Sequence, residues 1–118
     1  MKVVLDTNFL IDLFRFKIGI EALEDFQIFL PQSVMRELKL ISKKKTRESI
    51  LAKVALEVLK KKQVTILTSF KTKTDDDLIE FAKQGYIVAT NDRELRKRLK
   101  RLGFKTIYLR ARKKIAVG

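Results

Sequence analysis

The feature that most restricts the fold is the alternation of short apolar runs with longer segments that carry apolar residues at helical spacing. Short runs of this kind are typical of buried strands, and the longer segments are typical of helices. The runs that predict strands are residues 3–5, 64–67, 86–89 and 106–109, and residues 28–30 form a further apolar segment that Pro31 ends. The segments that predict helices are 9–16, with Asn8 as a candidate cap, 32–44, 46–62, 74–84 and 92–102.

Strands that alternate with helices favour parallel pairing, because each parallel pair needs a right-handed crossover connection. The sequence therefore predicts an α/β fold, a three-layer sandwich with a parallel sheet between helices. The 118 residues are 46 % hydrophobic, which suffices for one core. Without a repeat or a linker, we expect residues 1–118 to be a single domain. From about residue 110 the chain is basic, and we expect a loosely ordered tail.

The chain shows no signal peptide and no membrane span. Its first apolar run is interrupted by Asp6 and Asp12, and no stretch approaches the roughly 20 apolar residues that a span requires. We therefore expect a cytoplasmic protein without membrane contact.

The absence of histidine and cysteine narrows the chemistry. It excludes Ser-His-Asp triads, Cys-His pairs, two-histidine ribonucleases, and zinc sites built on thiolate or imidazole. Catalysis must then use carboxylates, amines, guanidinium groups, hydroxyls or amides. Among these, clustered carboxylates that bind a hard cation are the most capable.

The net charge of +13, from 27 Lys and Arg against 14 Asp and Glu, indicates an anionic partner. Nucleic acid is the commonest partner of this kind, and an anionic membrane surface is the competitor. Positive charge is concentrated in the lysine run at residues 43–45, between two predicted helices, and on the helix that follows Asp92. A solvated helix face is the alternative, but the imbalance favours contacts with an RNA backbone. The candidate residues are Lys43, Lys44, Lys45, Arg93, Arg96, Lys97 and Lys100.

Acidic residues follow three of the predicted strands, where ligands bind in open α/β sheets. Asp6 ends the first strand, Asp92 follows the strand 86–89, and an aspartate triplet opens the helix at 74–84. Each has a structural alternative. Asp6 and Asp92 can cap the helices after them, and the triplet resembles a capping box that suits the helix dipole.

Glu37 interrupts an otherwise apolar helix face. Val34, Leu38 and Ile41 form a stripe at helical spacing, and Glu37 lies in or beside it. A salt bridge to Lys or Arg is the alternative explanation. Taken together, acids at strand ends and on an inward face can converge on one pocket. Their mutual repulsion then calls for a cation, and Mg²⁺ or Mn²⁺ suits oxygen ligands.

Four motifs in this order resemble the PIN-domain family of small nucleases, which occur in toxin–antitoxin modules and in ribosomal RNA processing. They are "VVLDTNFLID", "SVMRELKLI", "DDDLIEFAKQGYIVATNDRELRKRLKRLG" and "TIYL", and the similarity covers residues 3–109. The resemblance implies a five-stranded parallel sheet between helices, and endonucleolytic cleavage of RNA with one or two Mg²⁺ or Mn²⁺ ions.

The family's four acids map onto Asp6, Glu37, Asp76 and Asp92. Asp76 is chosen because the family's acid stands two residues before the first aliphatic residue of its helix, here Leu78. Asp75 or Asp77 would replace it if the register is one residue off. The resemblance implies that Asp6, Asp76 and Asp92 are the main metal ligands. It implies that Glu37 either completes the ligand set or holds a metal-bound water. Asn8 and Thr90 match supporting positions, and Glu94 matches a further acid of some members.

Two other functions compete with a ribonuclease. A catalytically silent RNA-binding or scaffold module on the same fold is opposed by the complete set of four acids. A phosphatase with Asp6 as nucleophile would usually need a second aspartate where Asn8 stands. The expected partners are RNA, an antitoxin protein if the chain is a toxin, and a second copy of the chain, for which the helices 9–16 and 46–62 could supply apolar surface.

Overall fold

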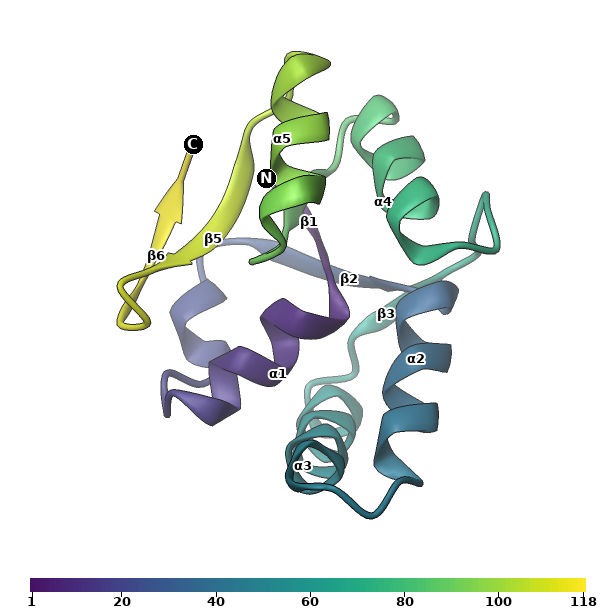
Figure 1. The fold of residues 1–118 in the computed structure, drawn as a ribbon, viewed down its shortest axis with the longest axis vertical. Coiled ribbons are helices and arrows are strands. Elements are labelled where there is room, and N and C mark those ends of the chain that lie inside the picture. The colour runs from purple at the N-terminus through teal and green to yellow at the C-terminus, as the bar shows by residue number, and fades with distance from the viewer.

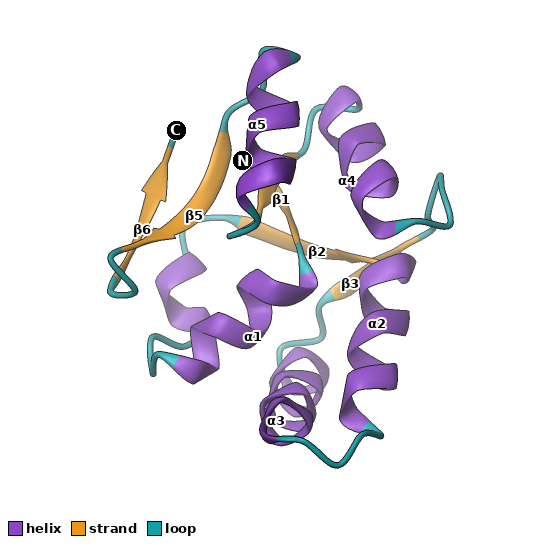
Figure 2. Cartoon of the chain, viewed as in Figure 1, coloured by secondary structure: helices purple, strands orange, loops and turns teal.

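A computed structural model describes all 118 residues as five α-helices, a short 3-10 helix and six strands (Figure 2). In chain order they are β1 (Lys2–Leu5), α1 (Thr7–Arg15), η1 (Ile20–Leu23), β2 (Gln27–Pro31), α2 (Gln32–Ser42), α3 (Arg47–Lys61), β3 (Thr65–Leu67), α4 (Thr74–Lys83), β4 (Ile87–Ala89), α5 (Arg93–Arg101), β5 (Thr106–Arg110) and β6 (Lys114–Val117).

The strands form one sheet in the order β3-β2-β1-β4-β5-β6, in which every neighbouring pair up to β5 is parallel. This confirms the predicted α/β fold with five parallel strands. The prediction of a loosely ordered tail is wrong, because β6 pairs antiparallel with β5 from Arg110↔Lys114 to Ile107↔Val117.

The helices cover both faces of the sheet (Figure 1). The chain leaves β1 through α1 towards β2 and leaves β2 through α2 and α3 towards β3, so these helices lie on one face. It then crosses to β4 through α4 and on to β5 through α5, in the opposite direction along the sheet. Right-handed crossovers place α4 and α5 on the other face.

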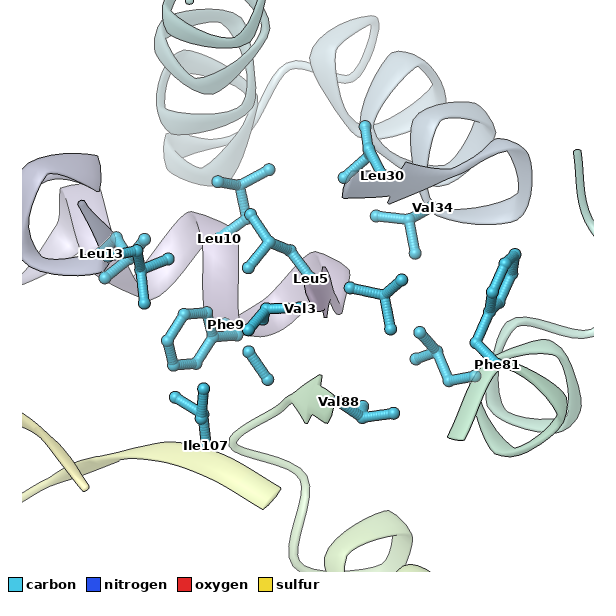
Figure 3. Close-up of a cluster of buried hydrophobic side chains, with 14 of the residues drawn as sticks. Val3, Leu5, Phe9, Leu10, Leu13, Leu30, Val34, Phe81, Val88 and Ile107 are labelled. Carbon is cyan, nitrogen blue, oxygen red and sulfur yellow. The ribbon is translucent and has the colours of Figure 1, made fainter. Parts of the chain in front are cut away.

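The core lies between the strands and the inward faces of these helices (Figure 3). The central strand β1 is buried from Val3 to Leu5, as expected for a strand with helices on both sides. From α1, Phe9 and Leu10 are fully buried against the sheet.

The structure identifies the residues that cap the N-termini of α1 and α5. The N-cap of α1 is Asp6, whose carboxylate accepts a hydrogen bond from the Thr7 amide, and not Asn8. The N-cap of α5 is Asp92, which accepts bonds from the amides of Glu94 and Leu95.

Helix α1 leaves little of the apolar surface that was expected of it for a dimer, with Phe14 and the C-cap Phe16 partly exposed. Its residues Phe9, Leu10, Ile11 and Leu13 are buried in the core. In α3 the buried face consists of Ser49, Ala52, Ala55 and Leu59, which leaves Ile50 and Val54 exposed. No helix of the protein has the length and apolar character needed to cross a membrane.

Candidate active site

The site lies where the sheet changes its direction of winding. Strands β1 and β4 are neighbours, but their connections lead to opposite edges and opposite faces of the sheet. The diverging connections leave a crevice at the carboxyl ends of these two strands, which is the usual ligand position in open α/β sheets. Asp6 follows β1 and Thr90 follows β4 at this point. The two strand ends are joined by a hydrogen bond from the Asp6 amide to the Ala89 carbonyl.

A pocket of about 330 Å³ opens at this crevice, and acidic side chains dominate it. Six carboxylates line it against a single basic side chain, that of Arg15. The complete lining is Asp6, Thr7, Asn8, Ile11, Asp12, Arg15, Glu37, Ile41, Glu48, Asp75 and Asp92.

Asp6 is the most deeply placed of these acids, with 5 % of its surface exposed. One carboxylate oxygen accepts from the Thr7 amide at 2.7 Å and the other from the Thr90 hydroxyl at 2.6 Å. Burial raises the pKa of Asp6 to about 6, although these two hydrogen bonds oppose the shift. The nearby charges of Asp75 and Glu37 add to the increase, and no Lys or Arg pairs with Asp6.

Glu37 has no salt-bridge partner, so the alternative of a compensating Lys or Arg does not apply. It accepts a hydrogen bond from the Thr7 hydroxyl through Oε1. Asp75 approaches the same pocket from the first turn of α4. Its pKa is raised by burial and then by the negative charge of Asp92.

The aspartate triplet divides into three roles. Asp75 lines the acidic pocket, whereas Asp76 lies outside it and pairs with Arg98 at 3.3 Å. Asp77 is fully buried and accepts from the Ser33 hydroxyl and from the amides of Phe70 and Lys71. The position chosen from the family pattern, Asp76, is thus one residue from the carboxylate that faces the other acids.

The two supporting residues lie beside the acids. Thr90 is fully buried, donates to Asp6, and accepts from the Asp92 amide, so one hydroxyl links two acids. Asn8 lines the pocket and accepts from the Asn91 amide at 3.3 Å. Glu94 is not part of the pocket: its side chain is 79 % exposed and lies 3.8 Å from Lys97.

Three pocket residues were not found from the sequence: Asp12, Arg15 and Glu48. Arg15 forms 2.7 Å ion pairs with both acids and so connects α1 with α3 across the pocket mouth. Asp12 also accepts from the Asn91 amide nitrogen Nδ2 at 2.9 Å. Asn8 and Asp12 stand four residues apart on α1 and so share a helix face, a spacing that could have indicated Asp12. Nothing local indicated Glu48, because its position depends on how α3 packs against α1.

The chemistry of these donors fits a divalent cation with hard-oxygen preference. All candidate ligands are carboxylates, and four of the six have no Lys or Arg partner, namely Asp6, Glu37, Asp75 and Asp92. No three acidic side chains are grouped closely enough to form a ready-made metal site. A bound Mg²⁺ would usually retain several water molecules and so would need only a few direct carboxylate ligands.

The basic residues selected from the sequence are close in the chain to residues that line this pocket. The exposed Lys43, Lys44 and Lys45 lie in the connection between Ile41 and Glu48, both of which line the acidic pocket. On the other side, Asp92 lines the acidic pocket and the next residue, Arg93, lines a second and basic pocket with Arg96, Lys97 and Lys100.

The chain is similar to known proteins along most of its length. The family described as "PIN like domain" matches residues 3–112. Ribonuclease VapC4 of Methanocaldococcus jannaschii is 31 % identical, over 95 % of this chain and 92 % of its own length. Ribonuclease VapC9 of Archaeoglobus fulgidus is 33 % identical, over 97 % of this chain and 87 % of its own length.

A solved structure supports the fold. A domain of a functionally unknown protein from Methanocaldococcus jannaschii superposes with a TM-score of 0.71 at 23 % identity, covering 93 % of this chain and 91 % of that one. With the family match along most of the chain, these relatives confirm the resemblance seen in the motifs, and this protein belongs to the PIN-domain family.

Proposed function

We propose that this protein is a metal-dependent endoribonuclease whose active site is the acidic pocket. The observation that carries the proposal is the convergence of Asp6, Glu37, Asp75 and Asp92 on one crevice at the β1–β4 switch point. The names of the two relatives, both ribonucleases, support RNA as the substrate.

The residues have distinct tasks in this proposal. Asp6, Asp75 and Asp92 would hold Mg²⁺ or Mn²⁺, which supplies a Lewis acid that activates water and neutralises phosphate charge. Thr90 fixes the Asp6 carboxylate and, through the Asp92 amide, the start of α5. Thr7 holds Oε1 of Glu37, which leaves Oε2 free to orient the attacking water.

The test is cleavage of mixed-sequence single-stranded RNA by the purified protein with Mg²⁺, with Mn²⁺ and with EDTA. Asp6→Asn and Asp75→Asn should each lower the rate by on the order of 100-fold or more, since each removes a charged ligand. Asp76→Asn is the matched control, because it removes the same charge one residue away, and it should retain most of the activity.

Two outcomes would change the conclusion. RNA that is bound but remains intact under every metal condition would favour the catalytically silent RNA-binding module. Loss of cleavage in Asp76→Asn with activity retained in Asp75→Asn would return the metal ligand to the position that the family pattern selected.

Of the two biological settings, we infer a toxin of a toxin–antitoxin module. Both relatives that match along most of their length carry the name Ribonuclease VapC. An antitoxin is then the expected protein partner. The prediction is that expression of the chain alone arrests growth, and that the product of an adjacent small gene relieves the arrest. Normal growth with active enzyme would instead favour RNA maturation.

A further inference from the structure

A second pocket, of about 380 Å³, lies along α5 beside the acidic pocket. Its walls are the helix on one side and, on the other, strand β5 with Gly118, the residue after β6. Four cations and no acidic side chain line it. The complete lining is Arg93, Arg96, Lys97, Lys100, Thr106, Tyr108 and Gly118.

The side-chain charges of this basic pocket are largely uncompensated. Among its four cations only Lys97 has an acidic neighbour, the exposed Glu94 at 3.8 Å, and Arg93, Arg96 and Lys100 form no ion pair. Like charges around one hollow repel each other unless an anion enters it. The lining therefore selects a negatively charged ligand.

Arg96 is fixed in place before any ligand arrives. Its guanidinium carbon lies 3.6 Å from the centre of the Tyr108 ring, and its Nε donates to the Thr106 hydroxyl at 3.4 Å. Thr106 is itself buried and donates to the Gly118 carbonyl. The stacked guanidinium keeps its two terminal nitrogens free, in the fork geometry that matches a phosphate. Preorganisation lowers the entropic cost of binding.

The position of the pocket indicates which anion it receives. Asp92, the N-cap of α5, lines the acidic pocket, and Arg93, the first residue of the helix, lines the basic pocket. Lys100 lies seven residues further along the helix, a rise of about 10 Å. A polymer with a phosphate at each unit can enter both pockets at once, whereas a free phosphate ion would occupy only one.

We propose that the basic pocket binds a backbone phosphate of the RNA strand at a position away from the bond that is cut. This inference rests on the proposed function for the identity of the polymer. It assigns Arg96 and Lys100 a role in holding the substrate, distinct from the chemistry at Asp6.

The test measures binding of a fluorescent 12-nucleotide RNA by anisotropy in EDTA, so that no cleavage occurs. Arg96→Gln and Lys100→Gln should each weaken binding by about tenfold, and each should reduce the salt slope of log K by about 0.7, the value for one lost single-strand phosphate contact. Arg96→Lys, which keeps the charge but not the fork, should lie between wild type and Arg96→Gln.

The matched control is Arg101→Gln. Arg101 is exposed on the same helix and carries the same charge, but it does not line the pocket. Its substitution should change affinity by less than about twofold and leave the salt slope unaltered. With metal present, Lys100→Gln, whose side chain is exposed, should raise KM for the 12-nucleotide RNA and leave kcat unchanged.

The outcomes separate this inference from the proposed function. An equal loss of RNA affinity in Arg101→Gln and Lys100→Gln, or no loss in either, would overturn the assignment of the basic pocket. It would leave the proposed nuclease function unaffected. Weaker RNA binding in the pocket variants, without cleavage under any metal, would uphold the pocket and overturn the nuclease. Competition by polyglutamate as strong as that by RNA would assign the pocket to acidic proteins and overturn the inference.

Discussion

Three consecutive aspartates, Asp75, Asp76 and Asp77, show how strongly the role of a carboxylate depends on helix phase. Successive residues of a helix point about 100° apart, so they face the acidic pocket, Arg98 and the protein interior respectively. The phase is set by where α4 begins, at Thr74, and by the bonds from Phe70 and Lys71 to Asp77. Neither is visible in the residue types, which is why the sequence located the triplet but not the member that faces the pocket.

The raised pKa of Asp6 predicts that this residue lowers the stability of the metal-free protein. Its pKa is 3.8 when unfolded and about 6 when folded, so the folded state binds the proton more tightly. Stability attributable to Asp6 is therefore present below about pH 4, falls as the pH rises through 6, and is absent above it. The difference corresponds to about 3 kcal/mol.

Asp6→Asn should accordingly raise the free energy of unfolding in EDTA at pH 7.5 by up to about 3 kcal/mol, and by much less at pH 4. Thr90 can accept a bond from the new amide group, and its own hydroxyl hydrogen can turn to Asn8 Oδ1, which lies 3.5 Å away. Urea unfolding at both pH values measures the difference. A destabilised Asp6→Asn protein at pH 7.5 would show that burial of the charge is not the dominant effect.

At the scale of the elements, local patterns predicted four of the five parallel strands and all five helices, because each combines apolar spacing with a clear end. Residues 28–30 of β2 were identified only as an apolar segment, and the fifth strand was implied by the family resemblance. Strand β6 was missed for two reasons. Its burial is only partial, and the hairpin turn before it uses Ala111 and Arg112 at φ 53° and 56°, in the left-handed region. Turns of this kind normally carry Gly or Asn, so the sequence offered no turn signal.

In helix α3, the sequence predicted the helix but not which of its faces is buried. Apolar residues surround much of this helix, and the buried side was chosen by the small residues Ala52 and Ala55, which allow close approach to α1 and α2. Large apolar residues such as Ile50 stay exposed as a result. How closely two helices pack depends on the side chains of both, so the sequence of one helix alone does not predict its buried face.

This packing makes Ala55 sensitive to added volume. Ala55→Leu inserts three heavy atoms at a fully buried position and should lower the free energy of unfolding by about 1–3 kcal/mol. Ile50→Gln on the exposed side of the same helix should change it by less than about 0.5 kcal/mol. Chemical denaturation of both variants provides the comparison. Equal effects would contradict the assignment of the buried face.

At the scale of the whole molecule, a net charge of +13 coexists with a pocket of six acids. The composition predicted an anionic partner, and the acidic residues at the strand ends predicted an acidic cluster. The sequence could not show that the acidic and basic pockets share one helix end, because the contacts between β1, β4 and α5 join distant parts of the chain.

The excess charge should make the fold more stable in salt and RNA binding weaker in salt. Raising KCl from 20 to 300 mM screens self-repulsion and should raise the stability by about 1 kcal/mol, on the order of 4 °C in Tm. The triple variant Lys43→Gln, Lys44→Gln, Lys45→Gln should gain less, because it has less repulsion to screen. Thermal melts of both proteins measure this. A Tm that is independent of salt would show that the charges are too dispersed to repel.

The hydrogen bond between Thr90 and Asp6 joins residues 84 positions apart, across the seam between β1 and β4. A growing chain that has reached only β3 already holds Asp6 and Glu37, but it has neither the Thr90 hydroxyl that positions Asp6 nor the carboxylate of Asp92. The site therefore comes into being late in synthesis, when the second half of the sheet closes on the first. For the proposed ribonuclease, that order of assembly would leave the nascent chain without a complete active site until the second half of the sheet has formed.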